Sequence, residues 1–317
     1  MTNWGIAATG GIARTVGTVI ASEPGMRVAA VGSRDVGRAA ALAADLGGAK
    51  AYGSYAELCA DPDVEAVYVA TPHAQHLRVA ELAIAEGKAV LCEKPLTASL
   101  ADAERLVKLA REAGVFLMEA MWMRFNPLVR RLATDERFGT IRSVQATFGF
   151  PLAFDATHRL WDPATGGGTV LDLGVYPIAL AHFLLGVPEE IHVTGSLAPS
   201  GVDAEAGILL TYPGGARALL DTSLLSPMAN AATIVGTGLR ADIDAPFWAP
   251  SRMVLRGPGV EPEEHLLDPA QGGYEGQVRE VAAALAEGRT ESAIMPLDDS
   301  LAVMRVMEEV RARLGAL

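Results

Sequence analysis

The residues Ala89-Val90-Leu91-Cys92-Glu93-Lys94-Pro95 give the clearest indication of the architecture. Four apolar residues follow a helix-like segment and end at a charged pair and a proline, as a buried strand of a parallel sheet does. Ligands of open α/β sheets bind just beyond the carboxyl ends of such strands. We therefore expect Lys94 to direct its ammonium into a ligand crevice, with Pro95 fixing the turn. The alternative is a solvated lysine at a strand end.

Length and composition restrict the class of protein. The chain has 317 residues, half of them hydrophobic, which is enough for two domains. Its formal net charge of −12 argues against a nucleic acid or an anionic membrane surface as a partner, because both need a basic face. The two cysteines, Cys59 and Cys92, indicate neither a disulfide framework nor a metal cluster. We expect a cytoplasmic protein with no signal peptide and no apolar run that could span a membrane.

A glycine turn near the N-terminus predicts a dinucleotide site. Trp4–Ala8 has the pattern of a strand, and Ile12–Ser22 has the pattern of a helix. The intervening turn lies where the dinucleotide-binding fingerprint requires it, although Ala8 stands where the full pattern has its first glycine. Free amides at a helix N-terminus suit a pyrophosphate. The expected contacts are Thr9, Gly10, Gly11 and Ile12. An ordinary strand–helix turn would share this pattern.

The next strand, Arg27–Gly32, ends on residues that favour NADP. The side chain that reads the ribose is expected about 20 residues past the glycines, and here the chain has Ser33-Arg34, with Arg38 one helical turn further on. A hydroxyl and planar guanidinium groups suit a 2′-phosphate better than a 2′-hydroxyl. Alternatively, Arg34 stacks on the adenine and NAD is also accepted, a possibility that Asp35 keeps open.

Two histidines follow another buried strand. Glu65–Ala70 has the strand pattern, and Thr71-Pro72-His73 comes directly after it, with His76 at the start of the next helix. Zinc needs at least a third protein ligand, and none is evident, so we expect these residues to contact the cofactor and no metal to bind. The regular alternation of strands and helices predicts a doubly wound parallel sheet.

The regular alternation of strands and helices ends after Trp122. We therefore expect a dinucleotide-binding domain at 1–122 and an α+β domain at 123–317. Ile141–Phe150 alternates apolar and polar residues, and strands and turns continue from Ile191 to Leu255, which predicts an open, largely antiparallel sheet. Its free face is a candidate surface for a homodimer or higher homo-oligomer. A charged, solvated face is equally compatible with the pattern.

A glycine run precedes the helix expected at Thr169–Leu185, which reads as amphipathic. Asp172 and Tyr176 are four residues apart and so lie on one face of this helix. Glycine leaves room for a close approach to a ligand. Alternatively, Asp172 is a first-turn charge that favours the helix dipole, and Tyr176 is a core residue.

Taken together, these motifs resemble the glucose–fructose oxidoreductase/inositol dehydrogenase (Gfo/Idh/MocA) family over nearly the whole chain. The motifs are Thr9-Gly10-Gly11-Ile12-Ala13, Thr71-Pro72-His73 with His76, Glu93-Lys94-Pro95, and Gly167-Gly168 followed by Asp172 and Tyr176. The resemblance implies a hydride transfer between NADP, or NAD, and a small polyhydroxylated substrate such as a sugar, a cyclitol or a dihydrodiol. A dinucleotide-sensing regulator and an imine- or biliverdin-type reductase share the architecture.

In this interpretation Tyr176 acts as general base in oxidation and as general acid in reduction. Lys94 lowers the pKa of the phenol, and Asp172 binds a substrate hydroxyl and holds Lys94. Trp161 and Arg124 are candidate pocket residues, or else packing and surface residues. The expected cofactor-contacting set also contains Glu93, Lys94, Trp122 and Arg124, and the expected substrate-contacting set is Lys94, Trp161, Asp172 and Tyr176.

Overall fold

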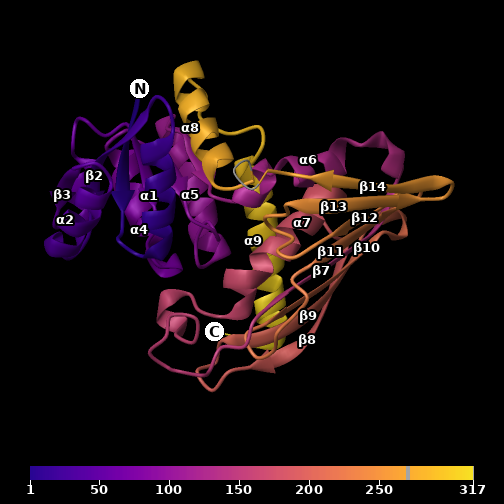
Figure 1. Ribbon diagram of the computed structural model, residues 1–317. Helices are drawn as coiled ribbons and strands as arrows, with labels where there is room; N and C mark the ends of the chain where they lie inside the picture. The colour runs from indigo at the N-terminus through magenta and orange to yellow at the C-terminus, as the bar shows by residue number, and fades with distance from the viewer. Residues whose placement is uncertain (269–271, 317) are drawn as a thin grey trace. The chain divides into compact units, whose positions relative to one another are not determined.

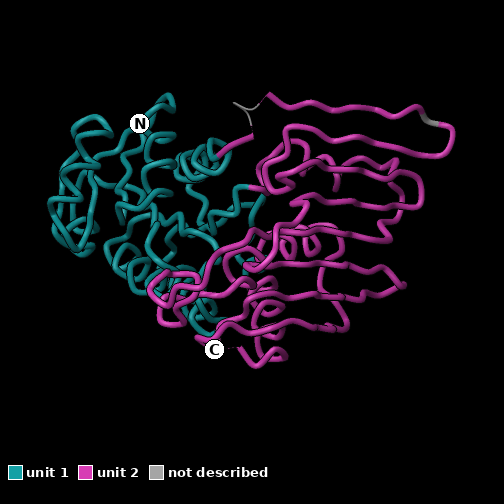
Figure 2. Tube along the Cα trace, turned by 60° about the horizontal axis from the view of Figure 1, so that its bottom comes forward, with its two compact units in different colours: residues 1–122, 274–300 teal, residues 123–273, 301–317 magenta. Residues whose placement is uncertain are grey.

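The computed structural model describes residues 1–268 and 272–316 (Figure 1). Its internal contacts divide the chain into two compact units (Figure 2). The first contains Met1–Trp122 and Tyr274–Ser300, and the second contains Met123–Gly273 and Leu301–Leu317. The expected domains, 1–122 and 123–317, differ from this division in the assignment of residues 274–300. The first unit is therefore discontinuous in the sequence.

The first unit is built on a six-stranded sheet in the order β3-β2-β1-β4-β5-β6, in which every pair of neighbours is parallel. The strands are β1 (Thr2–Ala7), β2 (Met26–Gly32), β3 (Lys50–Tyr52), β4 (Ala66–Val69), β5 (Ala89–Cys92) and β6 (Leu117–Glu119). The strand order reverses between β1 and β4, which is the topological switch point of a doubly wound sheet. The predicted parallel fold is confirmed.

Helices connect these strands. They are α1 (Gly11–Ser22), α2 (Val36–Asp45), α3 (Tyr55–Cys59), α4 (His76–Ala85) and α5 (Leu100–Ala113), joined by α8 (Glu275–Glu287) and the start of α9 (Leu297–Leu314). Helix α5 illustrates the local causes: Ser99 accepts a hydrogen bond from the Asp102 amide, and Gly114 ends the helix in the left-handed conformation. Every residue of β4 and β5 is buried, which explains their continuous apolar runs.

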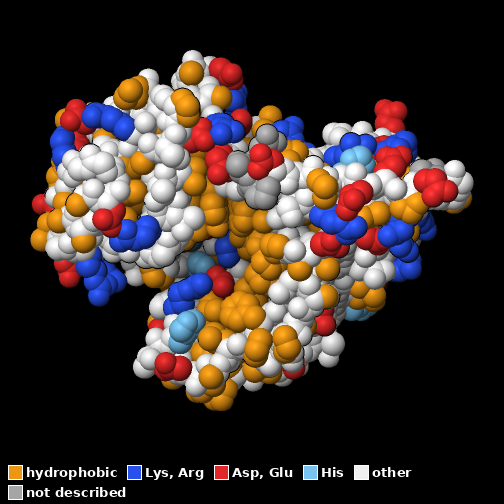
Figure 3. Space-filling view, viewed as in Figure 1, with side chains coloured by type: hydrophobic (Ala, Val, Ile, Leu, Met, Phe, Trp, Pro, Cys, Tyr) orange, Lys and Arg blue, Asp and Glu red, His pale blue; other side chains and the backbone are white. Residues whose placement is uncertain are grey.

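The second unit is built on an eight-stranded sheet in the order β14-β13-β12-β11-β7-β10-β9-β8. The strands are β7 (Ile141–Gly149), β8 (Glu190–Leu197), β9 (Asp203–Thr211), β10 (Arg217–Ser223), β11 (Ala232–Gly236), β12 (Arg240–Ile243), β13 (Arg252–Gly257) and β14 (Val260–Leu266). Strands β7 and β10 pair in parallel, and the other neighbours pair antiparallel, so the predicted largely antiparallel sheet is confirmed. Over β12–β14 acidic and basic side chains are interspersed (Figure 3).

Helices α6 (Pro127–Thr134), α7 (Val175–Leu185) and the end of α9 complete the second unit. Short 3₁₀ turns lie at His73–Gln75, Trp122–Phe125, Glu136–Phe138, Pro163–Thr165 and Pro213–Gly215. The prediction of an amphipathic helix at Thr169–Leu185 was wrong in two respects. It begins as a π-helical turn, Val170–Gly174, and residues 169–181 are buried on every side because they form core rather than surface.

Within the described residues, the stretch Pro163–Leu185 is long and apolar enough to cross a bilayer, with a mean hydropathy of 1.5. The expectation that no apolar run would meet this criterion was therefore wrong. However, 78% of its most apolar window is buried inside the structure, as the core helix of a globular unit is.

Candidate active site

The register of the first sheet brings the carboxyl ends of its central strands into one row. Ala7 of β1 pairs with Val69 of β4, and Val69 pairs with Cys92 of β5. Gly32 of β2 pairs with Ala7 on the other side. The segments that leave this row are Thr9–Ile12, Ser33–Arg38, Thr71–His76 and Glu93–Lys94. Four stretches that the sequence singled out thus start at the same edge of one sheet, where ligands of this fold bind.

The glycine turn leaves the start of helix α1 open. Gly10 is the N-cap, no side chain caps the helix, and a Cβ added at Gly10 or Gly11 would meet no atom within 4 Å. The free first-turn amides and the space beside them fit a pyrophosphate. Ala8 has a φ of 125°, a conformation that glycine adopts more easily, which explains why the full fingerprint has glycine there.

The end of β2 carries two exposed guanidinium groups. The buried Ser33 hydroxyl accepts a hydrogen bond from the Asp35 amide at 3.3 Å, and the Asp35 carboxylate caps α2 by accepting from the Arg38 amide at 3.1 Å. Within the described part of the chain, neither Arg34 nor Arg38 forms an ion pair. Asp35 is therefore engaged as a helix cap, and the two free cations fit a phosphate group.

His76 joins the loop after β4 to the loop after β5. Its ring is wholly buried, with Nε2 at 2.8 Å from the Thr71 carbonyl oxygen and Nδ1 at 3.0 Å from the Pro95 carbonyl oxygen. Burial lowers the pKa of His76 to about 4, so the ring is neutral near pH 7 and donates to one of the two carbonyls. His73 lies beside it, with ring centroids 5.7 Å apart. No group of three potential metal ligands occurs among the described residues.

The loop that carries Lys94 rests on two buried carboxyl groups. Glu93 accepts hydrogen bonds from the Tyr68 hydroxyl of β4 and, at 3.3 Å, from the Lys94 amide. Glu119 at the end of β6 accepts one from the Leu96 amide at 3.0 Å. Burial, reinforced by Glu93, raises the pKa of Tyr68, and burial raises the pKa of Glu119 to about 7. Sequence reasoning missed Tyr68 and Glu119; an acidic residue directly after the apolar run Val115–Met118 was the available signal for Glu119.

In the second unit Asp172 is paired with a residue that the sequence analysis did not select. Its carboxylate accepts hydrogen bonds from the Arg159 guanidinium at 3.1 and 3.3 Å, a bidentate pair. The Asp172 side chain is 9% exposed, whereas that of Arg159 is 51% exposed. Arg159 therefore holds a nearly buried carboxylate from the solvent side, and no sequence periodicity links these two residues.

Tyr176 of α7 lies in an aromatic cluster. Its ring centroid is 5.9 Å from that of Phe148 in β7 and 5.8 Å from that of Trp248, and those two rings stack at 3.7 Å. The phenol ring therefore lies against this stacked aromatic pair, and 6% of the residue is exposed. Phe148 and Trp248 were missed because aromatic residues in a strand and a loop carry no distinctive spacing.

The other predicted site residues occupy different surroundings. Trp161 is buried against Phe154 and donates its indole N–H to the Ala153 carbonyl at 2.9 Å. Arg124 is buried with its guanidinium carbon 4.1 Å from the centre of the Phe183 ring, which is a cation–π contact. In the first unit, Trp122 stacks on Tyr274 with a centroid separation of 4.4 Å. Lys94 belongs to the first unit, and Asp172 and Tyr176 to the second, so their meeting stays a prediction.

The parallel sheet with its switch point and the open glycine turn define a dinucleotide-binding protein of the Rossmann type. A family model described as "Oxidoreductase family, NAD-binding Rossmann fold" matches residues 2–121, and a model of the GFO/IDH/MocA C-terminal domain matches residues 128–241. The chain therefore belongs to the Gfo/Idh/MocA family of oxidoreductases, which confirms the predicted family and identifies the protein as an enzyme.

Individual relatives agree with this assignment over the full chain. Trans-1,2-dihydrobenzene-1,2-diol dehydrogenase of Mus musculus is 37% identical over 324 residues, which cover 98% of this chain and 96% of the relative. KijD10, a 3-ketoreductase from Actinomadura kijaniata solved in complex with NADP, superposes with a TM-score of 0.83 at 29% identity, covering 98% and 97% of the two chains. An aldose-aldose oxidoreductase from Caulobacter crescentus, at 24% identity and a TM-score of 0.89, covers 99% and 97% and shares the fold.

The subfamily predicted from the sequence is also confirmed. Four motifs are most like dimeric dihydrodiol dehydrogenase, also described as NADP-dependent D-xylose dehydrogenase: Trp122–Phe125, Trp161-Asp162-Pro163, Gly201-Val202-Asp203 and Pro296-Leu297. The trans-1,2-dihydrobenzene-1,2-diol dehydrogenase of Homo sapiens is likewise similar to this chain, at 35% identity over 327 residues and 98% of this chain.

Proposed function

We propose that the protein is an NADP(H)-preferring dehydrogenase that acts on a CH–OH carbon of a sugar, a cyclitol or a dihydrodiol. The observation that carries the proposal is the strand register that starts the glycine turn and the Lys94 loop at one edge of the parallel sheet. The names of the relatives, a dihydrodiol dehydrogenase and a 3-ketoreductase solved with NADP, support the substrate and cofactor classes.

The residues that would hold the cofactor come from four loops of the first unit. The open start of α1 would bind the pyrophosphate, and Ser33, Arg34 and Arg38 would bind the 2′-phosphate. The remaining proposed contacts are Thr71, Pro72, His73, Glu93, Lys94 and Trp122 from the first unit, and Arg124 from the second. His76, whose ring is wholly buried, would support the cofactor site by holding the loops after β4 and β5 together. When bound, the nicotinamide accepts the hydride in oxidation and supplies it in reduction.

The chain's own residues would move the proton. Tyr176 takes the proton of the substrate hydroxyl in oxidation and returns it in reduction. A free phenol titrates near about 10, so Tyr176 needs the ammonium of Lys94 beside it to work near neutral pH. Asp172, held in a bidentate pair by Arg159, accepts a hydrogen bond from a second substrate hydroxyl and orients the ring. Trp161 contributes apolar surface behind this site.

The test is turnover of Lys94→Ala and Tyr176→Phe on a panel of aldoses, inositols and dihydrodiols, followed as NADPH formation. Each variant should lose about 10²- to 10⁴-fold in kcat, because each removes positioned proton transfer or its electrostatic support. His182→Gln, on the same helix as Tyr176 but bonded to the Gly186 carbonyl, is the matched control and should keep its turnover. Normal turnover by Tyr176→Phe, or a panel without any substrate, would contradict the proposal.

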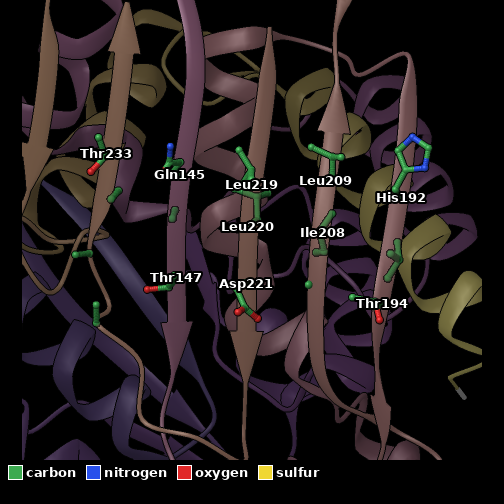
Figure 4. A pocket seen from close by; sticks show the side chains of 16 residues that line it. Gln145, Thr147, His192, Thr194, Ile208, Leu209, Leu219, Leu220, Asp221 and Thr233 are labelled. Carbon is green, nitrogen blue, oxygen red and sulfur yellow. The ribbon is translucent and has the colours of Figure 1, made fainter.

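We propose further that the enzyme is a cytoplasmic homodimer. The outer face of the second sheet carries a hollow of about 650 Å³ lined by residues of β7, β8, β9, β10 and β11 and of the loop before β11 (Figure 4). Leu209 and Leu219 on this face are 37% and 45% exposed. A second copy presenting the same face would cover this apolar surface.

The proposed cytoplasmic location rests on the cysteines. Cys59 and Cys92 are buried free thiols, which suits a reducing compartment.

A further inference from the structure

A buried carboxylate caps the turn that carries Asp172. Asp203 is the first residue of β9 and is wholly buried, and its Oδ2 accepts a hydrogen bond from the Val170 amide at 2.5 Å. Val170 begins the π-helical turn that contains Asp172 and leads into α7 and Tyr176. No side chain of the turn itself caps it. The anionic cap that a helix start favours therefore comes from another element, 33 residues further along the chain.

The backbone before the turn is shaped to admit this carboxylate. Gly168 has a φ of +106°, and a Cβ at that position would overlap Asp203 Oδ1. Any other residue would be strained by its φ and would also push the carboxylate away. The next residue, Thr169, is anchored separately, because its hydroxyl lies 2.7 Å from that of Thr222 in β10. The start of the turn is thus fixed from two neighbouring strands.

The C-terminal helix supplies the compensating charge. Arg311 of α9 places Nε at 3.7 Å from Asp203 Oδ1, and its side chain is 17% exposed. Burial raises the pKa of Asp203, and the Val170 amide and Arg311 oppose that rise. A carboxylate in this position is costly to bury unless it is both hydrogen-bonded and paired, and here it is both.

We propose that Asp203, supported by Arg311, is a positioning residue of the reaction: it fixes the turn that sets the places of Asp172 and Tyr176. The inference rests on the proposed function, because it assigns a role to Asp203 only if those two side chains act on the substrate. Displacement of catalytic groups by about 1 Å costs on the order of 100-fold in rate, so the loss of a backbone anchor should be measurable as turnover.

The test is Asp203→Ala in the full-length enzyme, compared with Asp135→Ala. Alanine is used because asparagine would keep an oxygen that accepts from the Val170 amide. Asp135 is the matched control, because it also caps a turn and binds arginines in the second unit, Arg131 and Arg137, but carries no proposed site residue. Both variants should lose stability. Only Asp203→Ala should lose about 10- to 100-fold in kcat, with the fluorescence-measured Kd of NADPH changed by less than about threefold.

Gly168→Ala provides a second approach, because it displaces the carboxylate without removing it or Arg311. It should give the same kcat loss, and it decides the question if Asp203→Ala does not yield folded protein by circular dichroism. Full turnover by a folded Asp203→Ala or Gly168→Ala, or an equal kcat loss in Asp135→Ala, would overturn the inference. If Tyr176→Phe is fully active, the proposed function fails instead, so the two failures are distinguishable.

Discussion

At the scale of single residues, Ala8 illustrates how the chain departs from its fingerprint. A φ of 125° suits glycine, and a non-glycine residue held there carries strain on the order of 1–3 kcal/mol. Glycine in place of Ala8 would lose more conformational entropy on folding, which costs about 0.5–1 kcal/mol. This cost is smaller than the strain that glycine would relieve. The first glycine of the fingerprint is thus a backbone requirement that this chain meets with alanine.

We predict that Ala8→Gly raises the free energy of unfolding by about 1 kcal/mol, the difference between these two effects. Urea denaturation of the purified protein measures it as a higher midpoint at an unchanged slope. Ala7→Gly, one residue earlier within strand β1, is the control and should lower the midpoint. A lower midpoint for Ala8→Gly would contradict the strain.

At the same scale, Arg34 is the residue proposed to set the cofactor preference. We predict that Arg34→Ala weakens NADP binding about 10- to 100-fold, since a hydrogen bond to a charged group contributes about 1.5–3 kcal/mol. NAD binding should change little, because it has no 2′-phosphate. Arg27→Ala, an exposed arginine of β2 that bonds Asn3, is the matched control. Titrations of both cofactors measure the effect, and equal losses for NADP and NAD would refute this role of Arg34.

At the scale of elements, the loop after β5 depends on its neighbours rather than on its own sequence. It is tied to the loop after β4 by His76, which contacts the Pro95 carbonyl, and to the end of β6 by Glu119, which accepts from the Leu96 amide. Lys94 lies directly before these two anchor points, Pro95 and Leu96. The placement of the lysine therefore depends on three strands at once, through contacts that no single segment contains.

We predict that Glu119 makes stability depend on pH. Its pKa rises from the usual 4.5 to about 7 on folding, so the protonated form stabilises the folded state. This contribution is fully present below about pH 4.5 and is lost as the pH rises through about 7, a change of up to about 3 kcal/mol. Urea denaturation of wild type and Glu119→Gln between pH 4.5 and 8 measures it: the wild type should weaken relative to the variant as pH increases. A constant difference would show that Glu119 does not titrate in this range.

At the scale of the whole molecule, the exposed face of the second sheet is the proposed dimer interface. We predict that the wild type has twice the mass of one chain by light scattering, and that Leu219→Glu is monomeric, because a carboxylate on a buried apolar face has no partner. Val187→Glu, exposed but outside the hollow, is the control and should stay dimeric. A monomeric wild type, or a dimeric Leu219→Glu, would exclude this interface.

The sequence by itself determined the parallel sheet, the glycine turn before α1 and the residues that end β4 and β5. Short apolar runs and the positions of glycine and proline indicate buried strands, turns and helix starts. These elements can therefore be recognised within about ten residues. It also predicted that Asp172 and Tyr176 share one helical face, because spacing along a helix is local, and this relation stays a prediction.

The tertiary structure alone decided what surrounds those residues. The π-helical start, the full burial of α7, the Arg159–Asp172 pair and the cap from Asp203 were not predictable from the sequence. Asp203 lies 33 residues from the amide that it caps, and Glu119 lies 23 residues from the amide that it anchors. Such contacts depend on which strands become neighbours, and they form only when burial of apolar surface brings distant segments together.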